Sequence, residues 1–141
     1  MIAPDSSVTI AAAAPWHVAH GAAVAALAAD EPSLITHVAF ETTAALSRMP
    51  VGQRLAPAVV MEWLEIRFRS RWIALPAVAT RRALRTAVEH GIRGGALYDA
   101  LVAATARHHD HTLLTADQRA APAYAALGAQ AVYIGAARGR D

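Results

Sequence analysis

The amino-acid sequence predicts an α/β protein, built as a three-layer sandwich with a mostly parallel five-stranded sheet. Short apolar segments alternate along the chain with longer, alanine-rich segments typical of helices. No hairpin signal joins neighbouring strand segments, so the strands are expected to run parallel with helical connections. The 141 residues are 55% hydrophobic and 17% charged, which suits one compact core. We expect a single domain over residues 1–135 and a C-terminal tail over residues 136–141.

The five predicted strands are short apolar segments. They are Met1–Asp5, Leu34–Thr36, Trp72–Leu75, Thr112–Leu114 and Ala131–Ile134. In a mostly parallel sheet, the carboxyl ends of such strands form the edge where ligands bind.

The predicted helices occupy the segments between these strands. Ser6 or Ser7 can cap a first helix that extends to about Ala29, and Pro15 should kink or divide it because proline lacks an amide donor. The other predicted helices are Val38–Met49, Leu55–Arg71, about Val78–His90, the helix that follows Gly94 and Gly95, and Gln118–Leu127.

Four acidic residues stand out by position and surroundings. Asp5 and Asp117 directly follow predicted strands, so both are expected at the carboxyl edge of the sheet. Asp99 and Glu41 are flanked by alanine, leucine and phenylalanine, where a surface charge would normally have charged neighbours. Ionised carboxylates about 5 Å apart repel by roughly 3 kcal/mol at an effective dielectric of about 20. Their convergence would therefore require retained protons or a divalent cation, and an all-oxygen set favours Mg²⁺ or Mn²⁺.

Each of these residues also has a structural interpretation. Asp99 would be favoured in a first helical turn by the helix dipole, and Asp117 could lie in a helix capped by Thr115 and Gln118. Asp5 could be a turn residue and Glu41 a solvated surface charge. Taken singly, these interpretations compete with a metal site.

Composition adds weaker information. All thirteen cationic side chains are arginine, which suits phosphate recognition, but thirty-seven alanines and no lysine point more to genomic base composition. No cysteine is present, which is typical of a cytoplasmic protein, and no segment reads as a signal peptide or a membrane span.

The ordered acidic motifs resemble the signature of PIN-domain ribonucleases, and are most similar to the small VapC-type toxins of toxin-antitoxin pairs. The motifs are Asp5-Ser6-Ser7, the lone Glu41, Tyr98-Asp99-Ala100 and Leu114-Thr115-Ala116-Asp117. The resemblance covers almost the whole chain. Pro4 is a departure, because the family normally has a β-favouring aliphatic residue before the first aspartate.

The resemblance implies a PIN-like fold and a Mg²⁺- or Mn²⁺-dependent endoribonuclease. Asp5, Glu41, Asp99 and Asp117 would be the catalytic, metal-binding residues, with Thr115 and Ser6 in support. It also implies a homodimer neutralised by a small cognate antitoxin in the cytoplasm. Arg119, the cation nearest to Asp117 in sequence, is the candidate phosphate contact.

Two other functions remain compatible with the sequence. One is a non-catalytic binding module, degenerate PIN-like or receiver-like, whose carboxylates are structural; the other is a metal-dependent small-molecule phosphohydrolase. Segments Val59–Phe68 and Leu97–Ala106 are apolar on more than one face, which favours a dimer. We expect an antitoxin groove around Trp63, Phe68 and Trp72.

Overall fold

The structure is a computed structural model that describes residues 1–135, so the predicted tail over residues 136–141 lies outside the described residues. The strands are β1 (Ile2–Pro4), β2 (Leu34–Ile35), β3 (Trp72–Ile73), β4 (Thr112–Thr115) and β5 (Ala131–Tyr133). The helices are α1 (Ser6–Ala13), α2 (His20–Ala28), α3 (Thr36–Ser47), α4 (Pro57–Arg67), α5 (Ala77–Glu89), α6 (Ala96–His108), the 3₁₀ turn η1 (Gln118–Ala120) and α7 (Ala121–Ala126).

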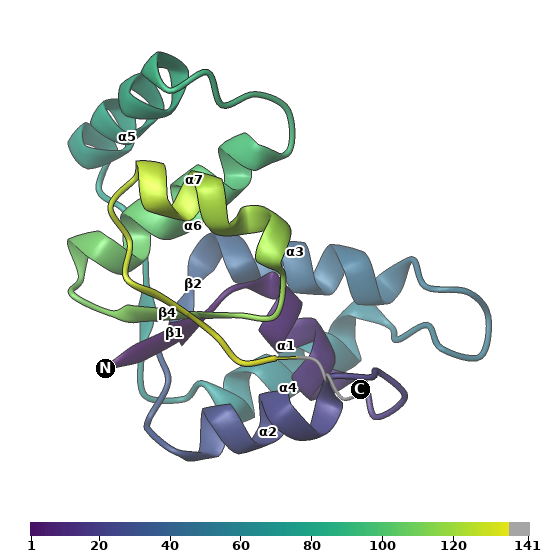
Figure 1. Ribbon diagram of the computed structural model, residues 1–141. Helices are drawn as coiled ribbons and strands as arrows, with labels where there is room; N and C mark the ends of the chain where they lie inside the picture. The colour runs from purple at the N-terminus through teal and green to yellow at the C-terminus, as the bar shows by residue number, and fades with distance from the viewer. Residues whose placement is uncertain (136–141) are drawn as a thin grey trace.

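All strand pairs are parallel, which confirms the predicted fold class. The strands form one group in the order β1-β4-β5 and a second group in the order β2-β3. A single isolated bridge between Ile2 and Pro32 joins the two groups. The pairings and the bridge give the strand order β3-β2-β1-β4-β5, with a weak seam between β2 and β1. Figure 1 shows β2, β1 and β4 next to one another.

Proline chemistry explains this seam. The amide of Asp5 donates to the carbonyl of Leu114 across the β1–β4 pair at 2.9 Å. Because alternate residues of a strand face opposite neighbours, Pro4 faces β2, where it has no amide to donate. On the β2 side the Ser33 amide still donates to the Ile2 carbonyl at 2.9 Å, so the contact between the two groups ends at Pro4. The proline before Asp5 thus weakens the β1–β2 contact and leaves the β1–β4 contact intact.

The helices form two groups on either side of the strands (Figure 1). Helices α5, α6 and α7 lie above the strands in that view, and α1, α2 and α4 lie below them, with α3 beside α1 and α4. The predicted division of the first helix at Pro15 is present, because α1 ends at Ala13 and α2 begins at His20. The last predicted helix is also divided, into η1 and α7, with Pro122 in the first turn of α7.

The apolar surface differs from the prediction. Most of α6 is covered within the chain, since Val102, Ala103 and Ala106 are buried. Phe68 is fully buried, edge-on to Trp63, so the prediction that Phe68 lines an antitoxin groove is wrong. Several exposed apolar side chains lie on α4 and α5, namely Val59, Ile66, Val78, Leu84 and Val88, and others lie elsewhere, such as Phe40 on α3. Within residues 1–135, no helix is long and apolar enough to cross a membrane.

Candidate functional site

The four predicted carboxylates come from four separate elements at one edge of the sheet. Asp5 directly follows β1, and Asp117 lies two residues after β4. Glu41 is in the second turn of α3, which starts where β2 ends, and Asp99 is in the first turn of α6. Parallel strands bring their carboxyl ends together, so the topology gathers residues 5, 41, 99 and 117.

Asp5 is buried and held by hydrogen bonds from both ends of the chain. Its carboxylate accepts from the Ser7 hydroxyl and, at 3.3 Å, from the Val8 amide, which makes it the N-cap of α1. The hydroxyl of Tyr124 in α7 donates to its other oxygen, Oδ2, at 2.6 Å. Burial and then the neighbouring Asp5 charge raise the pKa of Tyr124, so this phenol keeps its proton and donates.

Ser7 connects Asp5 to the segment after β4. Its Oγ accepts from the Ala116 amide at 2.8 Å and lies 3.5 Å from the Thr115 Oγ1. The Thr115 hydroxyl in turn accepts from the Asp117 amide at 3.0 Å. One serine hydroxyl therefore sets the position of β1 relative to the loop that carries Asp117.

Asp117 caps the 3₁₀ turn that follows β4. Its Oδ1 accepts from the backbone amide of Arg119 at 3.0 Å and from the guanidinium Nε at 3.2 Å. The Arg119 side chain is 92% exposed, so this ion pair is a weak, surface contact. The interpretation that Asp117 lies inside a helix capped by Thr115 and Gln118 is wrong, because Asp117 is itself the N-cap of η1.

The carboxylates of Glu41 and Asp99 have fewer hydrogen-bond donors and cations around them than those of Asp5 and Asp117. Desolvation raises the pKa of Glu41, the Asp5 charge adds to this effect, and His37 and Ser6 oppose it. Desolvation, followed by the charges of Glu41, Asp5 and Asp117, raises the pKa of Asp99 to about 6. Among residues 1–135, no hydrogen-bond donor contacts the Asp99 carboxylate, and Arg119 gives only a small opposing effect.

A histidine and a tyrosine flank this pair of carboxylates. His37 lies one helical turn before Glu41, with Nε2 3.5 Å from a Glu41 oxygen. That ring nitrogen is buried and makes no hydrogen bond within the described part of the chain. The ring of Tyr98, next to Asp99, stacks on His37 with centroids 5.2 Å apart and 16° between the planes. The stack links the two helices that carry Glu41 and Asp99.

We call Asp5, Ser7, Thr115, Asp117 and Tyr124 the strand side of the site, and His37, Glu41, Tyr98 and Asp99 the helix side. The carboxylates of the two sides affect each other electrostatically. Within residues 1–135, however, no three acidic or histidine side chains form a closed group of metal ligands. The carboxylates therefore face one another across the edge of the sheet without converging on one point.

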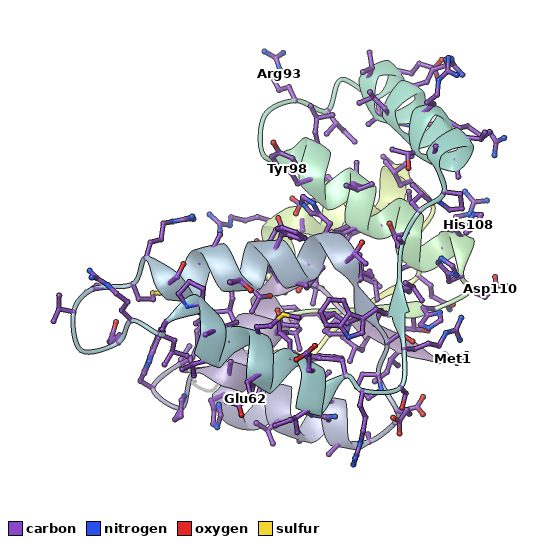
Figure 2. The ribbon with its side chains drawn as sticks, turned by 180° about the vertical axis from the view of Figure 1, so that it is seen from behind. Met1, Glu62, Arg93, Tyr98, His108 and Asp110 are labelled. Atoms are coloured by element: carbon purple, nitrogen blue, oxygen red, sulfur yellow. The ribbon has the colours of Figure 1, made fainter. Side chains whose placement is uncertain are left out.

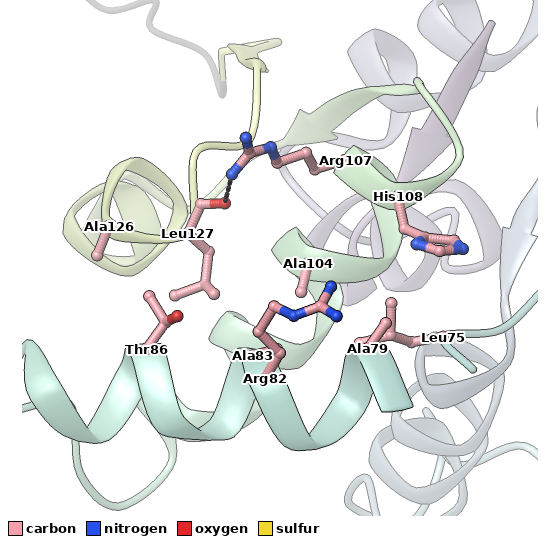
Figure 3. Close-up of a pocket in the computed structure, with 10 residues that line it drawn as sticks. All are labelled: Leu75, Ala79, Arg82, Ala83, Thr86, Ala104, Arg107, His108, Ala126 and Leu127. Atoms are coloured by element: carbon pink, nitrogen blue, oxygen red, sulfur yellow. Dashed lines mark hydrogen bonds between the residues drawn. The ribbon is translucent and has the colours of Figure 1, made fainter. Parts of the chain in front are cut away.

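A separate cavity lies at the other end of α6 (Figure 3). It has a volume of about 310 Å³ between α5, α6 and α7, and Arg82, Arg107 and His108 are among its lining residues. The Arg107 guanidinium donates to the Leu127 carbonyl at 3.4 Å. Asp99 and Arg107 are eight residues apart on one helix, or about 12 Å at 1.5 Å per residue. This cavity is therefore distinct from the carboxylate site.

The sequence prediction did not assign four residues of the site, which are Ser7, His37, Tyr98 and Tyr124. Tyr124 is the single polar side chain in α7, and a buried phenol needs a partner. His37 and Glu41 are four residues apart, the spacing that places two side chains on one helical face. The only signal for Ser7 in the sequence is its position next to Asp5 and Ser6. Ser6 itself contacts Glu41, and its hydrogen bond lowers the pKa of that carboxyl.

The sequence of this chain is similar to that of known proteins. The PIN domain pattern matches residues 2–126. The chain is 44% identical over 127 residues to Ribonuclease VapC40 of Mycobacterium tuberculosis, in strains CDC 1551 / Oshkosh and ATCC 25618 / H37Rv, covering 90% of this chain and 94% of the relative. It is 38% identical over 131 residues to Ribonuclease VapC27 of strain ATCC 25618 / H37Rv, covering 93% of this chain and 95% of the relative.

Two solved structures share the fold. The crystal structure of FitAcB from Neisseria gonorrhoeae matches with a TM-score of 0.71 and 21% sequence identity, covering 95% of this chain and 98% of the other. The structure of FitAB bound to an IR36 DNA fragment matches with a TM-score of 0.69 and 21% identity, covering 95% of each chain. At this identity the likeness supports the fold alone.

Proposed function

Because the chain belongs to the PIN-domain family and is homologous to VapC ribonucleases, we propose that it is a metal-dependent endoribonuclease, with residues 1–135 as one catalytic domain. The observation that supports this proposal is that Asp5, Glu41, Asp99 and Asp117 come from four elements at the carboxyl edge of the sheet and influence one another electrostatically. The relatives named above are ribonucleases, which favours this chemistry over a small-molecule phosphohydrolase or a silent binding module.

The residues present fit a hard divalent cation. All four candidate ligands are carboxylates, and Mg²⁺ and Mn²⁺ prefer oxygen ligands. The pKa of Asp99 is raised first by desolvation and then by the negative charge of three neighbouring carboxylates, and no donor within residues 1–135 offsets this effect. Among the described residues Arg119 pairs with Asp117 alone, and its side chain is highly exposed. A cation bound between the strand side and the helix side would offset this charge.

The chain's own residues would then have distinct tasks. Tyr124 and Ser7 hold the Asp5 carboxylate in one orientation, and Thr115 holds the backbone that carries Asp117. Ser6 supports Glu41. When bound, the Mg²⁺ or Mn²⁺ ion supplies an acidified water and stabilises charge on the phosphodiester undergoing attack. The exposed Arg119 is free to leave Asp117 and pair with a phosphate oxygen, for which its planar fork is suited.

A cleavage assay on a mixed pool of structured RNAs tests the proposal. A pool is needed because a sequence-selective nuclease would leave most single oligonucleotides uncut. We expect cleavage with Mg²⁺ or Mn²⁺, none in EDTA, and recovery when the metal is restored. Cleavage that persists in EDTA would contradict the metal-dependent mechanism. Release of phosphate from small phosphate esters with no RNA cleavage would favour the phosphohydrolase instead.

We further propose that the protein acts in the cytoplasm as a toxin that a small cognate antitoxin neutralises. The homology to VapC proteins supports this role. Expression in bacteria should arrest growth, and the arrest should be absent with Asp99→Asn and relieved by coexpression of the antitoxin. Arrest of equal strength with Asp99→Asn would show that RNA cleavage is not its cause.

We also propose a homodimer. On α4 and α5, the side chains of Ile66, Val78 and Val88 are more than 60% exposed in the single chain and offer an apolar surface for association. Light scattering at micromolar concentration should give the mass of two chains. A clean monomer mass would contradict the dimer and leave the proposed chemistry unaffected.

A further inference from the structure

The aromatic pair on the helix side has a feature that the carboxylate chemistry does not use. Tyr98 is stacked on His37, yet the residue remains 56% exposed. A tyrosine that only filled space between α3 and α6 would bury most of its ring, since apolar area is stabilising when removed from water. The imidazole therefore lies against this ring while more than half of the residue stays exposed.

Tyr98 lies at the rim of the proposed active site. It immediately precedes Asp99 in the first turn of α6, and its stacking partner His37 lies 3.5 Å from Glu41. Figure 2 shows Tyr98 at the start of α6, with His108 and Asp110 at the opposite end. Two proposed metal-binding carboxylates therefore each adjoin one ring of the stack.

The stack is held in place by the fold. His37 and Glu41 are one turn apart on α3, so both project from the same side of that helix. The backbone amide of Tyr98 donates to the Gly95 carbonyl at 3.0 Å at the start of α6. Tyr98 also lines an apolar cavity of about 290 Å³ between α5 and α6, with Leu84, Leu97 and Leu101 among the other lining residues. There is thus room beside the tyrosine for a flat, weakly polar group.

We propose that Tyr98 is a base-stacking residue, which holds one nucleobase of single-stranded RNA next to the phosphodiester to be cut, and that His37 positions its ring. This inference rests on the proposed ribonuclease function. Proteins that bind single-stranded RNA commonly stack unpaired bases on aromatic side chains. A base held there would place its own phosphate near Glu41 and Asp99.

The decisive test pairs changes in the protein with changes in the RNA. Cleavage sites are first mapped with the wild-type protein, and a short RNA containing one site is made with an abasic residue at each position that flanks the cut. Tyr98→Leu should lower kcat/KM about tenfold, within the range for losing one base-aromatic stack. An abasic residue at one flanking position should cause the same loss in the wild type. The two changes together should cost no more than either alone.

Two variants serve as controls. Tyr98→Phe keeps the ring and should retain kcat/KM within about twofold, because stacking does not need the hydroxyl. Trp16→Leu removes another exposed aromatic residue, from the α1–α2 connection, and should leave the response to abasic RNA unchanged. Independent, multiplicative losses for Tyr98→Leu and the abasic residue would overturn the stacking role. So would equal cleavage of intact and abasic RNA by the wild type.

A binding measurement tests the same inference without cleavage. Short single-stranded RNAs with 2-aminopurine at successive positions are mixed with the Asp99→Asn variant, which should bind RNA without cutting it. We expect fluorescence quenching at one position, and loss of that quenching in Asp99→Asn combined with Tyr98→Leu. Quenching that survives in the double variant would overturn the role of Tyr98. Absence of RNA cleavage by the wild type would instead count against the proposed function, so the two failures are distinguishable.

Discussion

Asp5 and Asp99 are carboxylates at the same edge of one sheet, yet their surroundings are opposite. Asp5 is buried and accepts hydrogen bonds from Ser7, Val8 and Tyr124. Asp99 is half-buried, has no donor within residues 1–135, and has a pKa raised to about 6. On the strand side, the folded chain itself supplies the hydrogen-bond donors for the Asp5 carboxylate. The helix side retains uncompensated charge, which is the property expected of the half of a metal site that the ion itself completes.

The difference between Asp5 and Asp99 indicates which residues should affect both stability and activity and which should affect them in opposite directions. Donors around Asp5 stabilise the fold and orient a carboxylate, so changes there should affect both properties. Ionised Asp99 is repelled by three carboxylates and destabilises the metal-free fold. A change that neutralises Asp99 should therefore remove activity and increase stability. Residues that serve function at a cost to stability are a known feature of active sites.

The largest expected effect is on catalysis. Asp99→Asn keeps the shape of the side chain but removes a charge needed for the metal, so kcat/KM on RNA should fall by more than about 100-fold, the upper end for changes to groups that only support metal ligands. Asp110→Asn is the matched control at the other end of α6. Asp110 is exposed with φ of 57°, a conformation that asparagine tolerates. Full activity in Asp99→Asn would refute the proposed role of the helix side.

The next effect is on folding of the strand side. Tyr124→Phe removes the donor to Asp5 Oδ2 and leaves a buried, charged acceptor without it, so the free energy of unfolding should fall by about 1.5–3 kcal/mol. Urea denaturation of metal-free protein measures this directly. Tyr133→Phe, at a tyrosine that is 41% exposed, should change the free energy of unfolding by less than about 0.5 kcal/mol. Equal effects at the two tyrosines would show that Asp5 is not held as described.

The smallest effect is on the pH dependence of stability. The folded-state pKa of Asp99 is about 6, above its ordinary value of 3.8, so the folded state binds the proton more tightly than the unfolded state. The stabilising contribution of protonated Asp99 to the free energy of unfolding is fully present below about pH 4 and is lost as the pH rises through about 6. Thermal unfolding in EDTA should show this loss in the wild type and a smaller one in Asp99→Asn. An unchanged pH profile in the variant would contradict the repulsion inferred for the helix side.

These differences also explain what the sequence could predict. Asp5 and Asp117 were predictable because a polar residue directly after a parallel strand falls at the carboxyl edge. Tyr124 and Ser7 were not, since their partners lie 119 and 109 residues away in the sequence and only the folded chain brings them together. The weak seam between β1 and β2 follows from Pro4, but predicting it requires knowing which neighbouring strand Pro4 faces. Burial of Phe68 at the end of α4 likewise depends on tertiary packing.

The central claim is that the helix side is completed by a divalent cation, and calorimetric titration of Mn²⁺ into metal-free protein tests it most directly. At neutral pH the wild type should bind Mn²⁺, and Asp99→Asn should bind it at least about tenfold more weakly, as expected when a metal site loses one of its supporting groups. Wild-type affinity should also fall as the pH drops below about 6, because protons then compete for Asp99. No binding at millimolar Mn²⁺, or equal affinity in the wild type and Asp99→Asn, would contradict the claim.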